Sequence, residues 1–369
     1  MSQALHGGRL LDAAKEFGLP PHSFVDFSAN INVLAPAVSP EDWETWRADV
    51  VRYPEADADG IRRRLAAVYR DNAEQLIPTA GAIEALYLAA RLFGGCKTAI
   101  VEPAFGDYSR AFEAGGCEYS RIPLARQLWQ APASEWAHLL EPFDAVVLGN
   151  PNNPTGSLQA RAELCRLLER VWKRPKCWIV DEAFIEFVAD HKRETLLPVL
   201  DKYPSLIVLR SLTKSWAIPG LRMGFLATSN PVWLAQLRKM QPPWSINSVT
   251  EAWAASNLTP GNHARLLAGL RELQEARLRF AARLGQIAGL LVCPSTCNFL
   301  LVEITEPSLD AHSIYRELGR RGLLVRVCDS FYGMSRGRFI RLAVRTDAEN
   351  NRLAEELEMI CAGRARKAA

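Results

Sequence analysis

Short apolar runs alternate with longer amphipathic stretches from about residue 80 to residue 230. The leucine and alanine spacing of Gly81–Phe93 and Ala160–Lys173 predicts amphipathic helices. The runs with the length and β-rich content of strands are Thr98–Val101, Ala145–Leu148, Cys177–Val180 and Leu206–Leu209. Alternation of strands and helices predicts an α/β fold with a mainly parallel sheet that helices cover on both faces.

The pattern changes after Pro260-Gly261. A long helical run rich in Leu, Arg and Ala covers Ala264–Arg283. Apolar segments follow at Asn298–Val302, Leu323–Val327 and Phe339–Val344, with helical patterns at Leu309–Arg320 and Thr346–Ile360. We therefore predict a large domain over residues 31–260 and a smaller α/β domain over residues 261–369, with residues 1–30 packing on the small domain as an arm.

Composition narrows the class of protein without naming its chemistry. The 369 residues are 49% hydrophobic and 23% charged, which is typical of a globular chain of two domains. The net charge of +3 is too small to indicate nucleic-acid binding, and no apolar stretch is long enough to span a membrane. The eight cysteines are scattered and the nearest pair, Cys293 and Cys297, has no histidine partner in sequence. We expect no metal site, no signal peptide and a cytoplasmic location.

Polar residues that carry chemistry follow three of the predicted strands. They are Asn150 to Gly156, Asp181 and Ser211 to Lys214, and such positions meet at the carboxyl edge of a parallel sheet. A lysine amine forms a Schiff base with an aldehyde cofactor, and hydroxyls with Arg222 suit its phosphate. Asp181 suits the protonated nitrogen of a pyridine ring. The set predicts pyridoxal 5'-phosphate, with Lys214 and Asp181 as catalytic residues.

Plainer interpretations exist for the same two residues. Lys214 read alone is a surface lysine, and Ser211-Leu212-Thr213-Lys214 also fits the S-x-x-K pattern of serine acylases. That pattern normally comes with S-D-N and K-T-G elements, and neither occurs in this chain. Asp181 read alone is a helix N-cap. The cofactor interpretation is preferred because it also accounts for Arg222.

Further cofactor contacts are weaker when taken one at a time. Gly81, Ala82 and Ile83 open a helix whose backbone N–H groups could meet the phosphate, although a helix start needs no such role. Phe105 could stack on the pyridine face, and Asn153 could bond its 3'-oxygen, with Pro154 a candidate cis proline. Phe105 could equally be a core aromatic, and Asn153 an ordinary turn residue.

Three residues suggest a dimer and an anionic substrate. Tyr53 could reach the phosphate of a neighbouring subunit, or simply pack in a turn. Arg341 lies on an apolar segment, where an inward guanidinium is costly without an anion, and a substrate α-carboxylate would supply one. Arg326 invites the same argument. Two such arginines indicate a substrate with two anionic ends, unless either lies on an edge strand.

These motifs resemble fold-type I pyridoxal-phosphate enzymes of the class I/II aminotransferase group. The resemblance rests on Asn153-Pro154-Thr155-Gly156, Asp181-Glu182-Ala183 and Ser211-x-Thr213-Lys214 with Arg222. It covers nearly the whole chain and implies a seven-stranded sheet in the large domain. Within the group, His6-Gly7-Gly8 and Asp26–Asn32 resemble L-threonine O-3-phosphate decarboxylases of cobalamin biosynthesis more than histidinol-phosphate aminotransferases.

The resemblance implies further roles. Phe184 would lie at the cofactor, where aminotransferases commonly have tyrosine. His6, Gly7, Gly8 and Asn32 would close over the substrate, whose phosphate would also meet Arg326. The implied product of threonine phosphate is (R)-1-amino-2-propanol O-2-phosphate with CO2, made by a homodimer.

Two segments depart from the family pattern and bear on the substrate. Val33-Leu34-Ala35-Pro36 stands where the family has proline and glycine, and Ser215-Trp216 where relatives often show Phe-Tyr. Phosphoserine or a phosphonate amino acid therefore stays open as a substrate. The alternatives are an aminotransferase acting on a substrate such as histidinol phosphate and a non-catalytic regulator that binds the cofactor.

Overall fold

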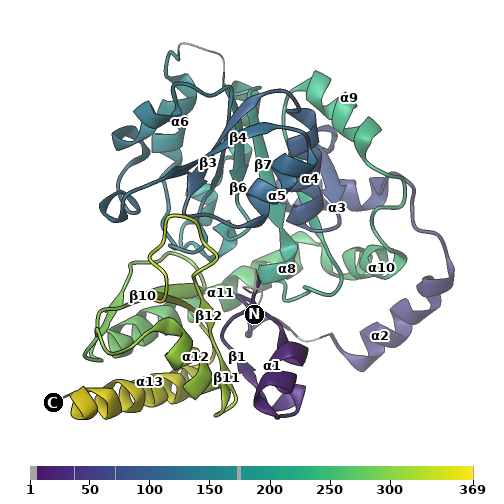
Figure 1. The fold of residues 1–369 in the computed structure, drawn as a ribbon. Helices are drawn as coiled ribbons and strands as arrows, with labels where there is room; N and C mark the ends of the chain where they lie inside the picture. Colours follow the sequence, from purple (N-terminus) through teal and green to yellow (C-terminus); the bar gives the residue numbers. More distant parts are fainter. Residues whose placement is uncertain (1–5, 37, 71, 173–175, 369) are drawn as a thin grey trace.

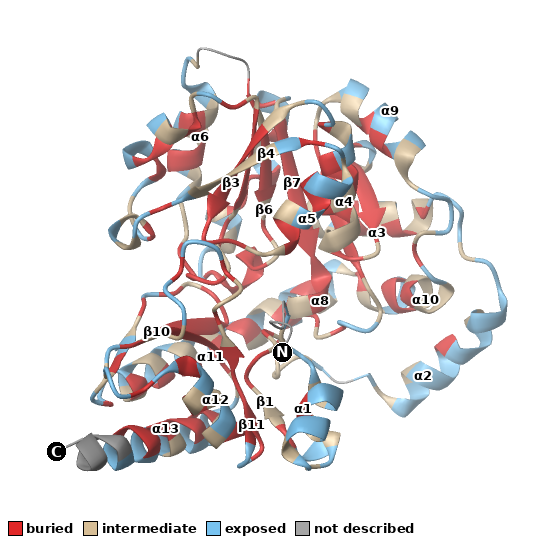
Figure 2. Cartoon of the chain, viewed as in Figure 1, coloured by how far each residue is buried: buried red, intermediate tan, exposed pale blue. Residues whose placement is uncertain are grey.

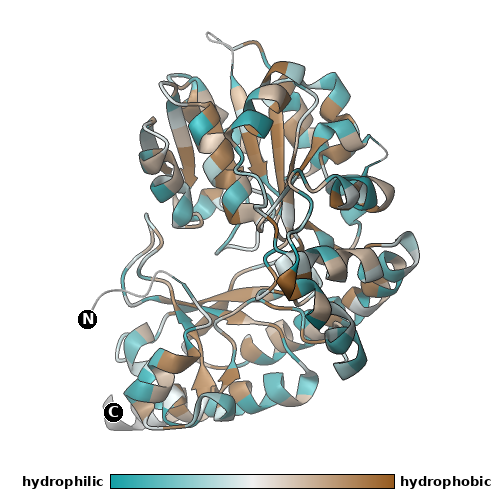
Figure 3. Ribbon diagram, turned by 90° about the vertical axis from the view of Figure 1, so that its right-hand side faces the viewer, coloured by the Kyte–Doolittle hydropathy of each residue, from teal (hydrophilic) through white to brown (hydrophobic). Residues whose placement is uncertain are grey.

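The computed structural model describes residues 6–36, 38–70, 72–172 and 176–368, with side chains described up to residue 363. Two bodies lie one above the other, each with apolar strands at its centre and polar helix faces outside (Figures 1 and 3). The upper body holds a seven-stranded sheet and the lower body a four-stranded sheet. No helix in the described part of the chain has the length and apolar content to cross a membrane.

The seven-stranded sheet confirms the predicted α/β architecture. Its order is β2-β8-β7-β6-β5-β3-β4, and every neighbouring pair is parallel except the two that β8 makes. The strands are β2 (Leu76–Thr79), β3 (Lys97–Glu102), β4 (Glu118–Pro123), β5 (Ala145–Gly149), β6 (Cys177–Asp181), β7 (Leu206–Ser211) and β8 (Gly224–Ala227). The inner strand β7 is buried along its whole length, as Figure 2 shows.

Side chains of the sheet alternate between two apolar layers, as the period of a strand requires. Ile179 and Ile207 face one layer, and Trp178 and Val208 face the other. The first layer is closed by α4 (Ala82–Leu92), α5 (Asp107–Ala114) and α9 (Pro231–Met240). The second is closed mainly by α3 (Asp59–Tyr69), α6 (Arg161–Glu169), α10 (Ser248–Asn257) and α11 (Pro260–Leu284).

The lower body is an antiparallel sheet of order β12-β13-β10-β9 with α11, α12 (Ala311–Gly319) and α13 (Asp347–Ala368). Its strands are β9 (Leu290–Val292), β10 (Phe299–Ile304), β12 (Arg326–Val327) and β13 (Phe339–Ala343). The N-terminal α1 (Leu10–Phe17) and β1 (Val25–Asp26) lie beside this body in Figure 1, where β1 pairs in parallel with β11 (Leu323–Leu324).

Several predicted boundaries differ from the structure, among them that of the helix predicted from Ala264, which begins at Pro260 as α11. The apolar segment at 323–327 is two strands with different partners, because β11 pairs with β1 whereas β12 pairs with β13. The helix predicted at 160–173 is α6, which ends at Glu169 because Arg170 turns to an extended conformation. The last helix continues beyond Ile360 to Ala368. None of these differences moves the carboxyl ends of β5, β6 and β7, where the predicted chemistry lies.

Candidate active site

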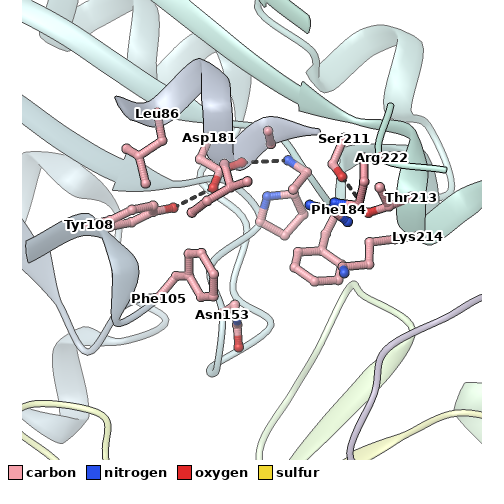
Figure 4. A pocket seen from close by; sticks show the side chains of 14 residues that line it. Leu86, Phe105, Tyr108, Asn153, Asp181, Phe184, Ser211, Thr213, Lys214 and Arg222 are labelled. Atoms are coloured by element: carbon pink, nitrogen blue, oxygen red, sulfur yellow. Dashed lines mark hydrogen bonds between the residues drawn. The ribbon is translucent and has the colours of Figure 1, made fainter. Parts of the chain in front are cut away.

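A cavity opens beyond the carboxyl ends of β5, β6 and β7 (Figure 4). Eight of the predicted cofactor residues line it: Ala82, Ile83, Phe105, Asn153, Phe184, Ser211, Thr213 and Arg222, together with both predicted catalytic residues, Asp181 and Lys214. In Figure 4 Tyr108 and Asp181 lie at one side of the cavity, and Lys214 and Arg222 at the other. The parallel strands thus collect residues that lie more than a hundred positions apart.

Lys214 lies in the single turn of α8 (Leu212–Ser215), directly after β7. Burial lowers the pKa of its amine to about 8, and the positive charges of Arg222 and Arg341 act in the same direction. The nearby carboxylate of Asp181 acts against them. A lysine with this pKa has a substantial neutral fraction near physiological pH, and the neutral amine is the form that attacks an aldehyde.

Asp181 is held at the opposite side of the cavity by two donors. The Tyr108 hydroxyl donates to its Oδ2 at 2.8 Å, and the Ala183 amide donates to its Oδ1 at 2.9 Å. Burial raises the pKa of Asp181, whereas these donors and the charge of Lys214 oppose the rise. Burial also raises the pKa of the Tyr108 hydroxyl well above its usual value, so Tyr108 keeps its proton and donates. A cation beside Asp181, such as a protonated pyridine nitrogen, would stabilise its ionised form.

Residues that could bind the phosphate of the predicted cofactor lie together at the N-terminus of α4. Gly81 has φ +80°, and a Cβ added there would lie 2.8 Å from Arg222 Nη2, so a side chain would push the guanidinium away. Arg222 is itself at φ +63° and donates from Nη1 to the Pro219 carbonyl at 2.9 Å. The hydroxyls of Ser211 and Thr213 lie 2.7 Å apart beside it. Backbone N–H groups, hydroxyls and a guanidinium form a suitable anion site.

The remaining cavity walls are aromatic and amide side chains. Phe105 and Phe184 both line the cavity, and Phe184 packs edge-on against Phe299 with ring centres 5.1 Å apart. The Asn153–Pro154 peptide bond is cis. The Oδ1 of Asn153 accepts a hydrogen bond from Arg341 Nη1. Asn153 therefore joins the cavity to the buried arginine on β13.

Arg341 is buried, with 6% of its surface exposed, and its hydrogen-bond acceptors are neutral. Besides Asn153 Oδ1, its Nη2 donates to the Ser28 carbonyl at 2.9 Å. Among the residues that the structure describes, no carboxylate forms an ion pair with Arg341. Burial lowers the pKa of its guanidinium to about 10. A buried cation with neutral partners is costly, and an incoming carboxylate would offset that cost.

Arg326 lies opposite Arg341 across β12 and β13 and is also buried. Its Nη2 donates to the Ser330 hydroxyl at 2.6 Å. Arg326 lines a second, wider cavity that His6 and Gly7 of the arm border as well. The two predicted substrate arginines are therefore neighbours, with Arg341 on the cofactor side and Arg326 on the arm side.

The arm crosses from the lower body to the rim of the cofactor cavity. His6 Nε2 lies 3.3 Å from Asp107 Oδ2, and its ring centre is 5.8 Å from that of Phe105. The Gly8 amide donates to the Ser28 hydroxyl at 2.9 Å, and a Cβ on Gly7 would overlap the Ser28 carbonyl oxygen. Glycine is thus required where the arm passes Ser28, which is the residue that also contacts Arg341.

Two predicted residues lie away from the cavity. The Asn32 amide donates to the Ser215 carbonyl at 2.8 Å and accepts from the Leu34 amide at 3.0 Å, so it faces the lysine-bearing turn. Its role as a substrate ligand stays a prediction. Tyr53 is 84% exposed and packs on Trp244 with ring centres 5.3 Å apart. It does not line the cavity of its own chain.

Sequence reasoning missed Tyr108, although its hydroxyl is bonded directly to Asp181. Its signal was the run after β3 that also contains Phe105, because both aromatics fall within a few residues of a strand's carboxyl end. Among the described residues, no group of histidine, cysteine and acidic side chains could hold a metal ion.

Comparison with known proteins gives consistent matches over most of the chain. The family model described as aminotransferase class I and II matches residues 39–357. The chain is 34% identical over 361 residues to the threonine-phosphate decarboxylase of Salmonella typhimurium, which covers 97% of each chain. It is 31% identical over 363 residues to the histidinol-phosphate aminotransferase of Symbiobacterium thermophilum, covering 97% of this chain and 96% of that one. A decarboxylase from Sulfurospirillum multivorans has a similar fold, with TM-score 0.86, 24% identity and coverage of 98% and 94%.

Proposed function

The chain belongs to the class I and II aminotransferase family and is a pyridoxal-phosphate enzyme, and from that premise we propose that it decarboxylates an O-phosphorylated amino acid. The proposed substrate is L-threonine O-3-phosphate, and the products are (R)-1-amino-2-propanol O-2-phosphate and CO2. Phosphoserine and a phosphonate amino acid are close analogues that the same site could take. The observation that carries the proposal is the likeness to the Salmonella decarboxylase over nearly the full length of both chains.

The cavity fits the cofactor in three separate respects. Gly81 leaves room for Arg222 at the N-terminus of α4, which suits a phosphate. Asp181 is a half-buried carboxylate with a raised pKa, and a cationic pyridine nitrogen beside it would lower that pKa. Lys214 supplies an amine with a lowered pKa within the same cavity. When bound, pyridoxal 5'-phosphate supplies a ring that withdraws the electron pair released when a bond to the substrate's Cα breaks.

Arg341 and Asn153 are the groups that would orient the substrate's carboxylate. Arg341 has neutral partners within the chain, so a carboxylate would give it the charged, bidentate partner that it lacks. The bond to be broken must stand perpendicular to the plane of the pyridine ring. Holding the carboxylate there would favour loss of CO2, whereas holding the Cα–H bond there would favour transamination.

The phosphate of the substrate would lie toward Arg326 and the arm. Arg326 is buried beside Ser330, and His6 and Gly7 border the same cavity. The Gly7 backbone borders this cavity, and a backbone N–H group suits an anion, whereas the Gly8 N–H already donates to the Ser28 hydroxyl. With Arg341 at one end and Arg326 at the other, the site would hold a molecule that carries two negative groups.

Lys214 also suits the return of a proton to the substrate. A pKa of about 8 means that its amine can hold or release a proton near neutral pH. After CO2 leaves, a proton must be added at Cα, and an acid whose pKa is near the working pH does this most efficiently. In this proposal Lys214 therefore serves the reaction twice, first as the attachment point and then as the proton donor.

Aminotransfer to or from a phosphorylated substrate is the second candidate. The 31% identity to the Symbiobacterium histidinol-phosphate aminotransferase favours it, because that match is also nearly full-length. The same lysine, aspartate and phosphate cradle would serve either reaction. The orientation of the substrate at Cα decides between them.

The proposed enzyme is a cytoplasmic homodimer in which Tyr53 reaches the phosphate of the neighbouring site. Tyr53, Val51 and Trp244 are large apolar side chains at the surface, with 84%, 90% and 50% of their surfaces exposed. Tyr53 follows α2 (Pro40–Arg47), which stands at the edge of the molecule in Figure 2. A second copy on this face would cover these side chains.

Product analysis tests the proposed function. The purified protein, loaded with pyridoxal 5'-phosphate, is incubated separately with O-phosphothreonine, O-phosphoserine and histidinol phosphate. Release of CO2 from O-phosphothreonine without any added keto acid supports the decarboxylase. Amino transfer from histidinol phosphate that requires 2-oxoglutarate, with no CO2 released, would replace it with the aminotransferase.

A further inference from the structure

A cluster of buried ionisable side chains lies beneath the lysine-bearing turn and lines no wall of the cofactor cavity. It consists of Glu182, Glu186, Arg210 and His263, whose exposed fractions are 1%, 5%, 3% and 9%. Taking such groups out of water costs free energy that ion pairing does not always return. These four residues belong to, or directly contact, the segments that carry Asp181 and Lys214. This placement suggests a role in the site rather than in general stability.

Glu186 is the centre of the cluster. Its Oε2 accepts a hydrogen bond from the hydroxyl of Ser215, the residue next to Lys214. Its Oε1 lies 2.8 Å from His263 Nε2 and 3.7 Å from Arg210 Nη2. Burial acts to raise the pKa of Glu186, but its contacts with His263, Arg210 and Ser215 outweigh burial and lower the pKa to about 2. The group that holds Ser215 is therefore a carboxylate at neutral pH.

Glu182 and Arg210 join the two catalytic segments to each other. Glu182 follows Asp181 directly, and Arg210 lies at the end of β7, four residues before Lys214. Arg210 Nη1 is 3.3 Å from Glu182 Oε2, and its guanidinium lies over the rings of Tyr69 and Phe225, 5.1 Å and 6.0 Å from their centres. Neither Arg210 nor Glu182 can move without losing its buried, oppositely charged partner.

Asn32 holds the same turn through its backbone. The Asn32 amide N–H donates to the Lys214 carbonyl at 3.0 Å, and the side-chain Nδ2 donates to the Ser215 carbonyl at 2.8 Å. Trp216 adds a bond from its Nε1 to the Tyr69 hydroxyl at 3.0 Å. The turn that carries Lys214 is thus fixed by both backbone and side-chain bonds, while the Lys214 side chain faces the cavity.

We propose that Glu186 is a positioning residue that acts through Ser215 to hold the Lys214 amine at a fixed position relative to Asp181. The inference rests on the proposed role of Lys214 in the preceding subsection. Loss of the Ser215–Glu186 bond would let the short helix α8 shift, and a displacement of the order of 1 Å can cost ~100-fold in rate. The bond links Ser215, which follows β7, to Glu186, which lies in the 3-10 turn Ile185–Phe187 after β6, the strand that ends at Asp181.

The test uses the full-length holoenzyme with four variants. Ser215→Ala removes the hydroxyl and keeps the backbone, Glu186→Gln keeps the shape and removes the charge, and the double variant measures their coupling. Thr228→Val is the matched control. Thr228 is fully buried, and its hydroxyl donates to the Leu206 carbonyl at 2.9 Å, at the end of β7 away from Lys214. Each protein is measured for kcat, KM, melting temperature and the rate at which the apo form regains visible absorbance with pyridoxal 5'-phosphate.

We expect Ser215→Ala to lower kcat and the rate of cofactor capture about tenfold, with KM changed less than about twofold. In the Glu186→Gln background the same substitution should have less than about a twofold further effect, because the two residues act as a unit. Thr228→Val should lower the melting temperature without changing kcat or capture.

Two results would overturn the inference. One is a Ser215→Ala protein whose kcat and capture rate stay within twofold of the wild type, whatever its melting temperature. The other is a Thr228→Val protein that loses as much kcat as Ser215→Ala does. Should Glu186→Gln fail to fold, Ser215→Ala and the control still decide the matter. Failure of the proposed function is distinguishable, because the wild type would then transfer an amino group instead of releasing CO2, while the rates of cofactor capture by the variants would still test the role of Glu186.

Discussion

Replacing Arg341 by methionine should lower kcat/KM strongly while leaving the apo protein at least as stable as the wild type. The guanidinium is buried, its partners are the neutral oxygens of Asn153 and Ser28, and burial lowers its pKa to about 10. The folded state thus binds this proton less tightly than the unfolded chain does. Below pH 10 the guanidinium is charged in both the folded and the unfolded state, and burying that charge lowers the stability of the folded state. The cost is relieved only as the pH rises through 10.

The size of the effect follows from that lowered pKa. At about 1.4 kcal/mol per pKa unit, the charge costs the fold about 3 kcal/mol. Methionine removes that cost but leaves two oxygens without a donor, at about 1 kcal/mol each. The net expectation is about 1 kcal/mol of added stability. Loss of a charged bidentate contact to the substrate carboxylate costs about 2–5 kcal/mol, so kcat/KM should fall at least about 30-fold.

Urea unfolding of the apo protein and steady-state kinetics measure the two effects. Arg345→Met is the matched control, because Arg345 lies just beyond the same strand and pairs with Glu349 at 2.8 Å. That variant should lose stability and keep its kcat/KM. A buried cation with only neutral partners should cost the fold more than it returns, so Arg341→Met must not be the less stable of the two. A kcat/KM of Arg341→Met within about twofold of the wild type would contradict the contact with the substrate carboxylate.

Three further outcomes are expected. Gly81→Ala should weaken pyridoxal 5'-phosphate binding at least about tenfold in a fluorescence titration. Gly95→Ala is the control, because Gly95 has a similar φ of +87° but no atom near its Cβ, and it should bind the cofactor normally. Equal losses in the two variants would refute the contact with Arg222. Cofactor capture by the apo protein should accelerate with pH and level off above about 8, because the neutral Lys214 amine is the reacting form; a flat profile from pH 6 to 9 contradicts the lowered pKa. Deleting residues 1–8 should raise KM for a phosphorylated substrate through loss of the His6–Asp107 and Gly8–Ser28 contacts that hold the arm. An unchanged KM would mean that the arm does not close the site.

The strands, and the grouping of the polar residues that follow them in one cavity, were predictable because both depend on local pattern. A strand such as Leu206–Leu209 is a continuous apolar run, and the polar residues that follow such runs meet at one edge of a parallel sheet. Lys214, Asp181 and Arg222 could therefore be brought together without coordinates. The short strands β2 and β8 could not, because their pairing depends on contacts between segments about 150 residues apart.

Roles that depend on contacts between distant segments could not be predicted from the sequence for the same reason. Tyr108 belongs to the site only because α5 brings its hydroxyl to Asp181 across the end of the sheet. Asn32 lies beneath the lysine-bearing turn because β1 leads the chain there after pairing with β11. The buried cluster around Glu186 depends on His263 from α11, which is 77 positions away. No local pattern distinguishes these residues from ordinary core or turn positions.

The most direct measurement is the location of the covalently trapped cofactor. The purified holoenzyme is reduced with borohydride, digested and analysed by mass spectrometry. The added mass of the reduced cofactor is predicted on the peptide that contains Lys214, and Lys214→Ala should carry none. Attachment to a different lysine, or an equal yield of labelled peptide from Lys214→Ala, would contradict the central claim.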